Sequence, residues 1–115
     1  MKLKLLTLIT ILTIVLSACT GVDSDPLDGT SWMLIWLGKE SLVPPTSISL
    51  TFEDGQASGN SGCNSYGGGY QVNGDKINFQ ELESTLMACI DPSGVMEQES
   101  AYLMFLGEAQ RFEIE

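Results

Sequence analysis

Apolar and polar residues alternate along much of the chain after residue 29, which is the pattern of β-strands with one buried face. The clearest case is the segment 47–53, SISLTFE, in which every second residue is apolar. Asp54-Gly55 follows it directly and predicts a hairpin, because both central residues of a type I′ turn need a positive φ. Asn73-Gly74 predicts a second hairpin. Two such turns in a short chain predict an antiparallel meander.

Three further segments extend the strand pattern. Residues 30–37 alternate with apolar residues on both faces, so we expect a strand that is covered on both sides, with Trp32 and Trp36 in the core. Residues 82–89 form another strand-like run. Residues 111–115 alternate again and predict the start of a strand that has no following turn or partner in the chain.

One segment, 95–109, has a helical period instead. Met96, Leu103 and Leu106 recur on one stripe, and Ser93 is placed to cap the first turn. We therefore expect one amphipathic helix that lies against the sheet or closes its open end.

The first 18 residues have the layout of a secretory signal, with two lysines, an apolar run from Leu5 to Leu16 and two small residues. The run is shorter than the roughly 20 residues that cross a bilayer. The sequence LSAC that ends at Cys19 resembles the lipobox of bacterial lipoproteins, which implies that Cys19 is lipidated and becomes the first residue of the mature chain. Stable anchoring takes more than one acyl chain. We expect an extracytoplasmic, lipid-anchored protein of the cell envelope. An aspartate directly after the lipidated cysteine often retains lipoproteins in the inner membrane; this chain has Thr20 there, so we expect the outer membrane if the source is Gram-negative.

Residues 19–29 are polar and acidic and contain Pro26 and two glycines, so they predict a flexible tether. The remaining residues, 30–115, are expected to form one domain, because a chain of 115 residues is long enough for one core and too short for two.

The composition of the chain argues against several classes of function. The net charge of −10 excludes phosphate-backbone binding, so we expect no nucleic-acid partner, and membrane contact through the lipid alone. The sequence has no histidine, which leaves Ser61 without the usual activating base. We expect no catalytic residues, no cofactor and no metal ion. The acidic pairs Glu81/Glu83 and Glu97/Glu99 are interpreted as solvated surface.

Cys63 and Cys89 remain as a pair once Cys19 is assigned to the lipid, in an exported and therefore oxidising setting. We expect a disulfide between them; two buried free thiols, or a metal site with two sulfur ligands, are the alternatives. Glycines near Cys63 would let the backbone turn sharply enough for the bond. The residues assigned to this structural loop are Gly62, Asn64, Gly67, Gly68 and Gly69.

The motifs GTSWML (29–34), SISLTFEDGQASGNSGCNSYGGGY (47–70), STLMAC (84–89) and MEQE (96–99) together resemble the META domain of HslJ-type bacterial heat-shock and envelope proteins. The resemblance implies a mainly β fold, a small antiparallel β-barrel-like meander of lipocalin-like topology with one helix. It also implies a disulfide between the two domain cysteines and a stress-related setting. Family members continue beyond the position of Glu115 through one or two strands, so either the chain is a fragment or its barrel is open.

These observations predict a non-enzymatic envelope domain with a binding or structural role. The alternative is a lipocalin-like carrier of a small apolar ligand, lined at the barrel mouth by Trp32, Trp36, Tyr66 and Tyr70. An empty interior would favour the carrier, and a filled interior would favour a protein-binding surface.

Overall fold

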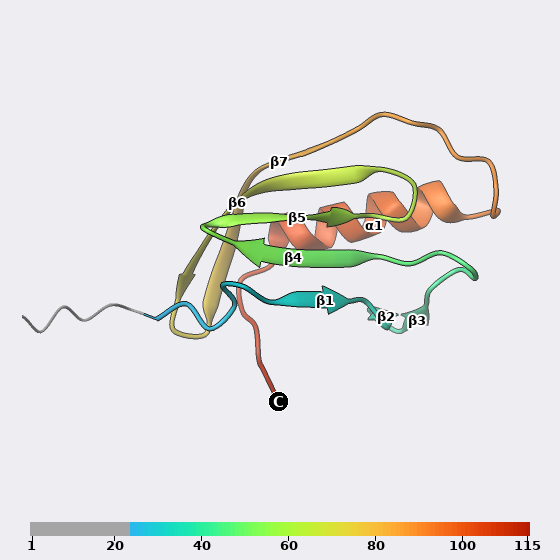
Figure 1. Cartoon of the computed structure of the whole chain (residues 1–115). Helices are drawn as coiled ribbons and strands as arrows, with labels where there is room; N and C mark the ends of the chain where they lie inside the picture. Colours follow the sequence, from blue (N-terminus) through green and yellow to red (C-terminus); the bar gives the residue numbers. More distant parts are fainter. Residues whose placement is uncertain (1–23) are drawn as a thin grey trace, which may run out of the picture.

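The computed structural model describes residues 24–115, so the expected signal at 1–18 and the lipid site at Cys19 lie outside the described residues. Figure 1 shows an antiparallel sheet with one helix across one face. The sheet order is β1-β4-β5-β6-β7, and β2 and β3 form a separate ribbon. The elements are β1 (Ser31–Met33), β2 (Trp36–Leu37), β3 (Glu40–Ser41), β4 (Ser49–Glu53), β5 (Gln56–Asn60), β6 (Ser65–Asn73), β7 (Lys76–Ser84) and α1 (Val95–Glu108).

The antiparallel meander and both hairpins are confirmed. Between β4 and β5 the central residues are Asp54 and Gly55, with φ of 50° and 77°, as a type I′ turn requires. Between β6 and β7, Asn73 pairs with Lys76, so the turn residues are Gly74 and Asp75, one position later than predicted. Gly74 has a φ of 64°, and a positive φ at the first central position is typical of a type II′ turn, which favours glycine there.

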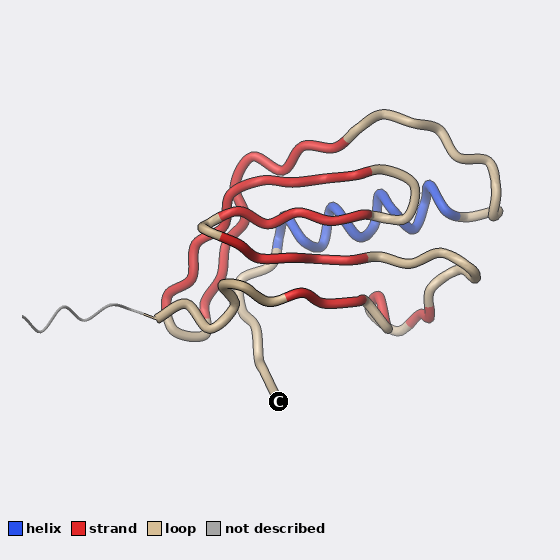
Figure 2. Tube along the Cα trace, viewed as in Figure 1, coloured by secondary structure: helices blue, strands red, loops and turns tan. Residues whose placement is uncertain are grey.

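The sheet is open rather than closed into a barrel, because its edge strands β1 and β7 do not pair with each other (Figure 2). The predicted strand at 111–115 is reduced to one bridge, between Lys76 and Arg111. Two backbone hydrogen bonds form this bridge at the start of β7, from Ile77 N to Gln110 O at 3.0 Å and from Phe112 N to Asp75 O at 3.0 Å.

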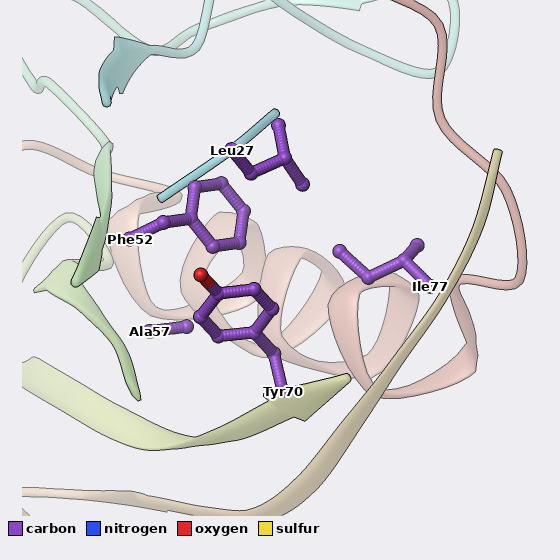
Figure 3. Close-up of a cluster of buried hydrophobic side chains, with 5 residues drawn as sticks. All are labelled: Leu27, Phe52, Ala57, Tyr70 and Ile77. Atoms are coloured by element: carbon purple, nitrogen blue, oxygen red, sulfur yellow. The ribbon is translucent and has the colours of Figure 1, made fainter. Parts of the chain in front are cut away.

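The core has two clusters of buried side chains. The first comprises Leu27, Phe52, Ala57, Tyr70 and Ile77 (Figure 3). Within it the rings of Phe52 and Tyr70 pack edge to face with centroids 4.7 Å apart. The second comprises Ile48, Tyr66, Tyr102 and Leu106, so it joins the sheet to α1.

The folded domain begins before residue 30, which corrects the second half of the predicted tether. Leu27 is only 4% exposed, although it lies within the acidic segment 19–29. Asp25 fixes it in place, because its carboxylate accepts one bond from Leu27 N at 2.8 Å and another from the Tyr70 hydroxyl at 2.5 Å. Burial of Leu27 and the two hydrogen bonds to the Asp25 carboxylate therefore make this polar segment part of the folded domain.

The expected single strand over 30–37 and its buried tryptophans are wrong. The segment is divided into β1 and β2, and Trp32 and Trp36 are 42% and 61% exposed. Leu34 and Leu37 pack against the second cluster instead. The sequence was ambiguous because both faces of the segment are apolar, and the structure covers only one of them.

The predicted helix is confirmed as α1, but its cap and buried face differ from the prediction. Gly94, with a φ of 89°, takes the N-cap position in place of Ser93 and makes no side-chain cap bond. The buried face comprises Val95, Gln98, Glu99, Tyr102 and Leu106. Two residues on this face, Gln98 and Glu99, are polar, so the spacing of apolar residues alone could not identify it. Within residues 24–115, no helix combines the length and hydrophobicity needed to span a membrane.

Candidate functional site

The turn between β5 and β6 is built by its own asparagine and glycine residues. Ser61 N donates to Asn64 O at 2.8 Å, and Gly62 N donates to the Asn60 side-chain oxygen at 2.8 Å. Gly62 has a φ of 120°, a conformation that favours glycine. Gly62 thus lies in the turn before Cys63, as expected, and Asn60 stabilises that turn through its side chain.

The three consecutive glycines do not belong to this turn. Gly67, Gly68 and Gly69 lie within β6, at a shift in its register with β7. A Cβ on Gly68 would lie 2.6 Å from the Gln80 backbone oxygen, closer than atoms can approach. Gly68 therefore admits the neighbouring strand β7 at a bulge, where Glu81 has a φ of 52°.

The predicted disulfide between Cys63 and Cys89 is confirmed, with the two Cα atoms 6.0 Å apart. This separation falls in the usual range for such bonds. The bond ties the turn to the segment between β7 and α1, across 26 positions of sequence.

A buried carboxylate, Glu99, lies beneath the same turn. It is 4% exposed, so its assignment to a solvated surface is wrong, while Glu81, Glu83 and Glu97 are exposed as expected. Its oxygens accept bonds from the Ser61 hydroxyl, from Asn64 N at 2.7 Å and from Asn64 Nδ2 at 2.8 Å. These donors make burial of a carboxylate tolerable, because hydrogen bonds to a charged group are stronger than those between neutral groups.

These contacts also set the charge of Glu99. Burial raises the pKa of the Glu99 carboxyl, but hydrogen bonds from Ser61, from Asn64 and from the Cys63 backbone outweigh this and leave the pKa below its usual value. Glu99 is therefore ionised at neutral pH. Because the folded pKa lies below the unfolded one, its contribution to stability is complete above the unfolded pKa and is lost as the pH falls through the folded pKa.

Asn64 links this cluster to the chain that follows β7. Its Oδ1 accepts bonds from Met87 N at 2.7 Å and from the Thr85 hydroxyl at 2.8 Å, and its Nδ2 donates to Met87 O at 3.0 Å. One side chain thus bonds both backbone groups of Met87 in place of a strand partner. The strand β7 ends at Ser84, which corrects the strand predicted through 89. We call Ser61, Asn64, Thr85 and Glu99 the polar clamp.

The segment held by the polar clamp exposes large apolar side chains. Leu86 is 93% exposed, Ile90 is 87% exposed and Met87 is 57% exposed. We call residues 85–90 the apolar loop. Figure 1 shows it at the end of the molecule away from residue 24, where the described chain begins.

The remaining buried polar groups also serve the fold. The Gln98 side chain accepts a bond from Val43 N at 2.7 Å and donates to the Thr46 hydroxyl at 3.0 Å, so it fixes the loop before β4. The hydroxyls of Tyr66 and Tyr102 lie 2.5 Å apart, and burial raises the pKa of both. The phenols therefore stay neutral.

Of the four residues predicted to line a ligand site, only Trp32 borders an apolar hollow. This hollow of about 260 Å³ lies between the sheet and the last residues. Trp36 is exposed on the β2–β3 ribbon, and Tyr66 and Tyr70 are buried in the two core clusters. Other residues around the hollow are Leu50, Phe52, Phe79, Leu106 and Phe112.

The network members that were not predicted as site residues include Ser61, Thr85, Gln98 and Glu99. The signal that could have found the last two is their place on the helical stripe that also carries Val95 and Tyr102. No such signal marks Ser61, because its partners are distant in sequence.

Fold and site together define a small antiparallel β domain whose single helix is joined to the sheet by a disulfide-linked turn and a buried carboxylate. The chain belongs to the META domain family, whose model matches residues 25–115. That boundary agrees with the burial of Leu27.

Two solved structures resemble the chain. An NMR structure of a protein from Burkholderia xenovorans is 38% identical with a TM-score of 0.54; the match covers 70% of this chain and 62% of that one, less than two thirds of its length. A second NMR structure has a TM-score of 0.62 at 18% identity, covering 77% of this chain and 76% of that one, and supports the fold alone. A search of curated proteins gave no significant match.

Proposed function

We propose that this META domain is a non-enzymatic, stress-related binding domain of the cell envelope, held there by a lipid on Cys19. The observation that carries the proposal is the contrast between its polar and apolar groups. Three residues of the polar clamp, Ser61, Asn64 and Glu99, are buried and occupied by internal bonds, whereas the apolar loop beside them is exposed.

The state of the polar clamp supports a structural role for it rather than catalysis. Ser61 is 0% exposed, and its hydroxyl bonds to Asn64 O and to Glu99. A nucleophile must reach its substrate, and a general base must be free to accept a proton. Ser61 and Glu99 meet neither condition in this arrangement.

The apolar loop supports a binding role. Burying a leucine or isoleucine side chain contributes about 1.5–3 kcal/mol, so Leu86 and Ile90 together offer substantial binding energy to a partner. Scattered exposed apolar residues are common on proteins. Here the backbone between the two side chains is already fixed by Asn64 and by the disulfide at Cys89, so binding would not have to order it.

A lipocalin-like carrier is the second candidate, and the hollow beside Trp32 favours it. Its volume of about 260 Å³ is below the usual 300–1,000 Å³ of small-molecule pockets, which would restrict it to a very small apolar ligand. The hollow also lacks three of the four aromatic residues assigned to it. We therefore rank the carrier below the binding domain.

Replacing Cys19 with alanine is expected to move the protein from the detergent phase to the aqueous phase in Triton X-114 partitioning, because acyl chains supply the affinity for the membrane. Ser17→Ala, which keeps a small residue before the cleavage point, should partition like the unchanged protein. Equal aqueous partitioning of all three proteins would contradict lipid anchoring.

A further inference from the structure

We propose that the apolar loop (residues 85–90) is the docking site for a partner protein, and that the partner presents an apolar pocket bordered by lysine and arginine side chains. The proposal rests on the proposed function and deepens it, because it states which surface binds and what chemistry would recognise that surface.

The apolar loop is exposed, but the rest of the fold holds its backbone in place. Thr85 N donates to Ser65 O at 3.0 Å, Met87 is bonded at both its N and its O by Asn64, and Cys89 is covalently bound to Cys63. Leu86 and Ile90 lie between and beside these fixed points, so their backbone positions are set before a partner arrives. A preorganised apolar surface binds with less entropy loss than a flexible one.

The surface around the apolar loop is acidic. Three exposed carboxylates flank it: Glu83 just before it, Asp91 just after it, and Glu97 in the first turn of α1. This turn lies beside the loop, because Cys89 N donates to the sulfur of Met96 at 3.4 Å. An apolar centre with a charged border is the usual anatomy of a protein interface, and an acidic border selects a basic one.

The same charges argue against the other occupants. A second copy of the chain would bring an identical acidic border against the first, and like charges across an interface are repulsive. An anionic membrane surface would repel the border as well. Figure 1 places the loop at the end of the molecule away from residue 24, so an anchor preceding that residue would leave the loop free.

The test uses the photoreactive amino acid p-benzoylphenylalanine, placed at Leu86 of the full chain in the cells that produce it. We expect a discrete adduct with another protein, and none from the same probe at Gln71, which is exposed on β6. Ile90→Ser, and separately Asp91→Lys with Glu97→Lys, should each lower the adduct yield by about tenfold or more. Unchanged thermal melting would show that each variant still folds.

Several outcomes would overturn the proposal. No adduct at Leu86, an adduct that both variants leave unchanged, or an adduct of twice the chain's mass would each do so. Binding of the Cys19→Ala chain to vesicles of phosphatidylcholine and phosphatidylglycerol through Leu86 would replace the protein partner with a membrane. The crosslinking experiment can also be done with the unlipidated Cys19→Ala chain in envelope extracts. An adduct there would not depend on the lipid anchor, so failure of the anchor and failure of the docking site can be distinguished.

Discussion

Replacing Asn64 with alanine is expected to lower the free energy of unfolding by about 3–5 kcal/mol, because it removes one donor to a buried carboxylate and the side-chain partner of both Met87 backbone groups. The change removes the bond from Nδ2 to Glu99 and all three bonds to Thr85 and Met87. The loss exceeds that of an ordinary side-chain bond because the Glu99 carboxylate stays buried.

Urea denaturation of the mature domain measures this effect. Asn60→Ala is the matched control, because Asn60 lies in the same turn but is exposed, and its side chain accepts one bond, from Gly62 N. It should cost about 1 kcal/mol. If Asn64→Ala costs no more than Asn60→Ala, the polar clamp does not hold the domain together.

Reducing the disulfide between Cys63 and Cys89 is expected to cost about 3–4 kcal/mol, because the bond restricts the unfolded chain over a loop of this length. The bond closes a loop that contains all of β6 and β7, across a separation of 26 residues. The measurement compares urea midpoints of the Cys19→Ala mature domain with and without a phosphine reductant.

A control with both Cys63 and Cys89 replaced by alanine should match the reduced protein and should not respond to the reductant. Two freely reacting thiols in the unreduced, unfolded domain would contradict the bond. Equal midpoints with and without reductant would show that it contributes nothing to stability.

Local chemistry explains what the sequence could predict. The Asp54-Gly55 turn was predictable because few dipeptides accept two positive φ values in succession, and the alternation in β4 because one face of it packs on the core. The cysteine pair was predictable from the oxidising setting implied by the signal. The helix was predictable as an element, because its apolar residues still recur at a helical spacing although two polar residues, Gln98 and Glu99, lie on its buried face.

The remaining features depend on contacts between distant segments. Nothing near Glu99 in the sequence distinguishes it from the solvated Glu97, because its donors come from a turn 35 and 38 positions earlier. Leu27 joins the core only because Phe52 and Tyr70 lie beneath it, within an otherwise polar segment. Trp32 was assigned to the core because both faces of residues 30–37 are apolar, and its place on the edge strand β1 left it partly exposed.

The proposed docking site requires the apolar loop to be exposed on a fixed backbone. Amide hydrogen exchange at Met87, followed by NMR in the folded oxidised domain, measures whether that backbone is fixed, because the Met87 N–H donates to Asn64 Oδ1 at 2.7 Å. We expect the Met87 amide to exchange about as slowly as the backbone amide of Asn64, which donates to Glu99. Exchange of Met87 at the rate of an unstructured peptide, with Asn64 still protected, would contradict it.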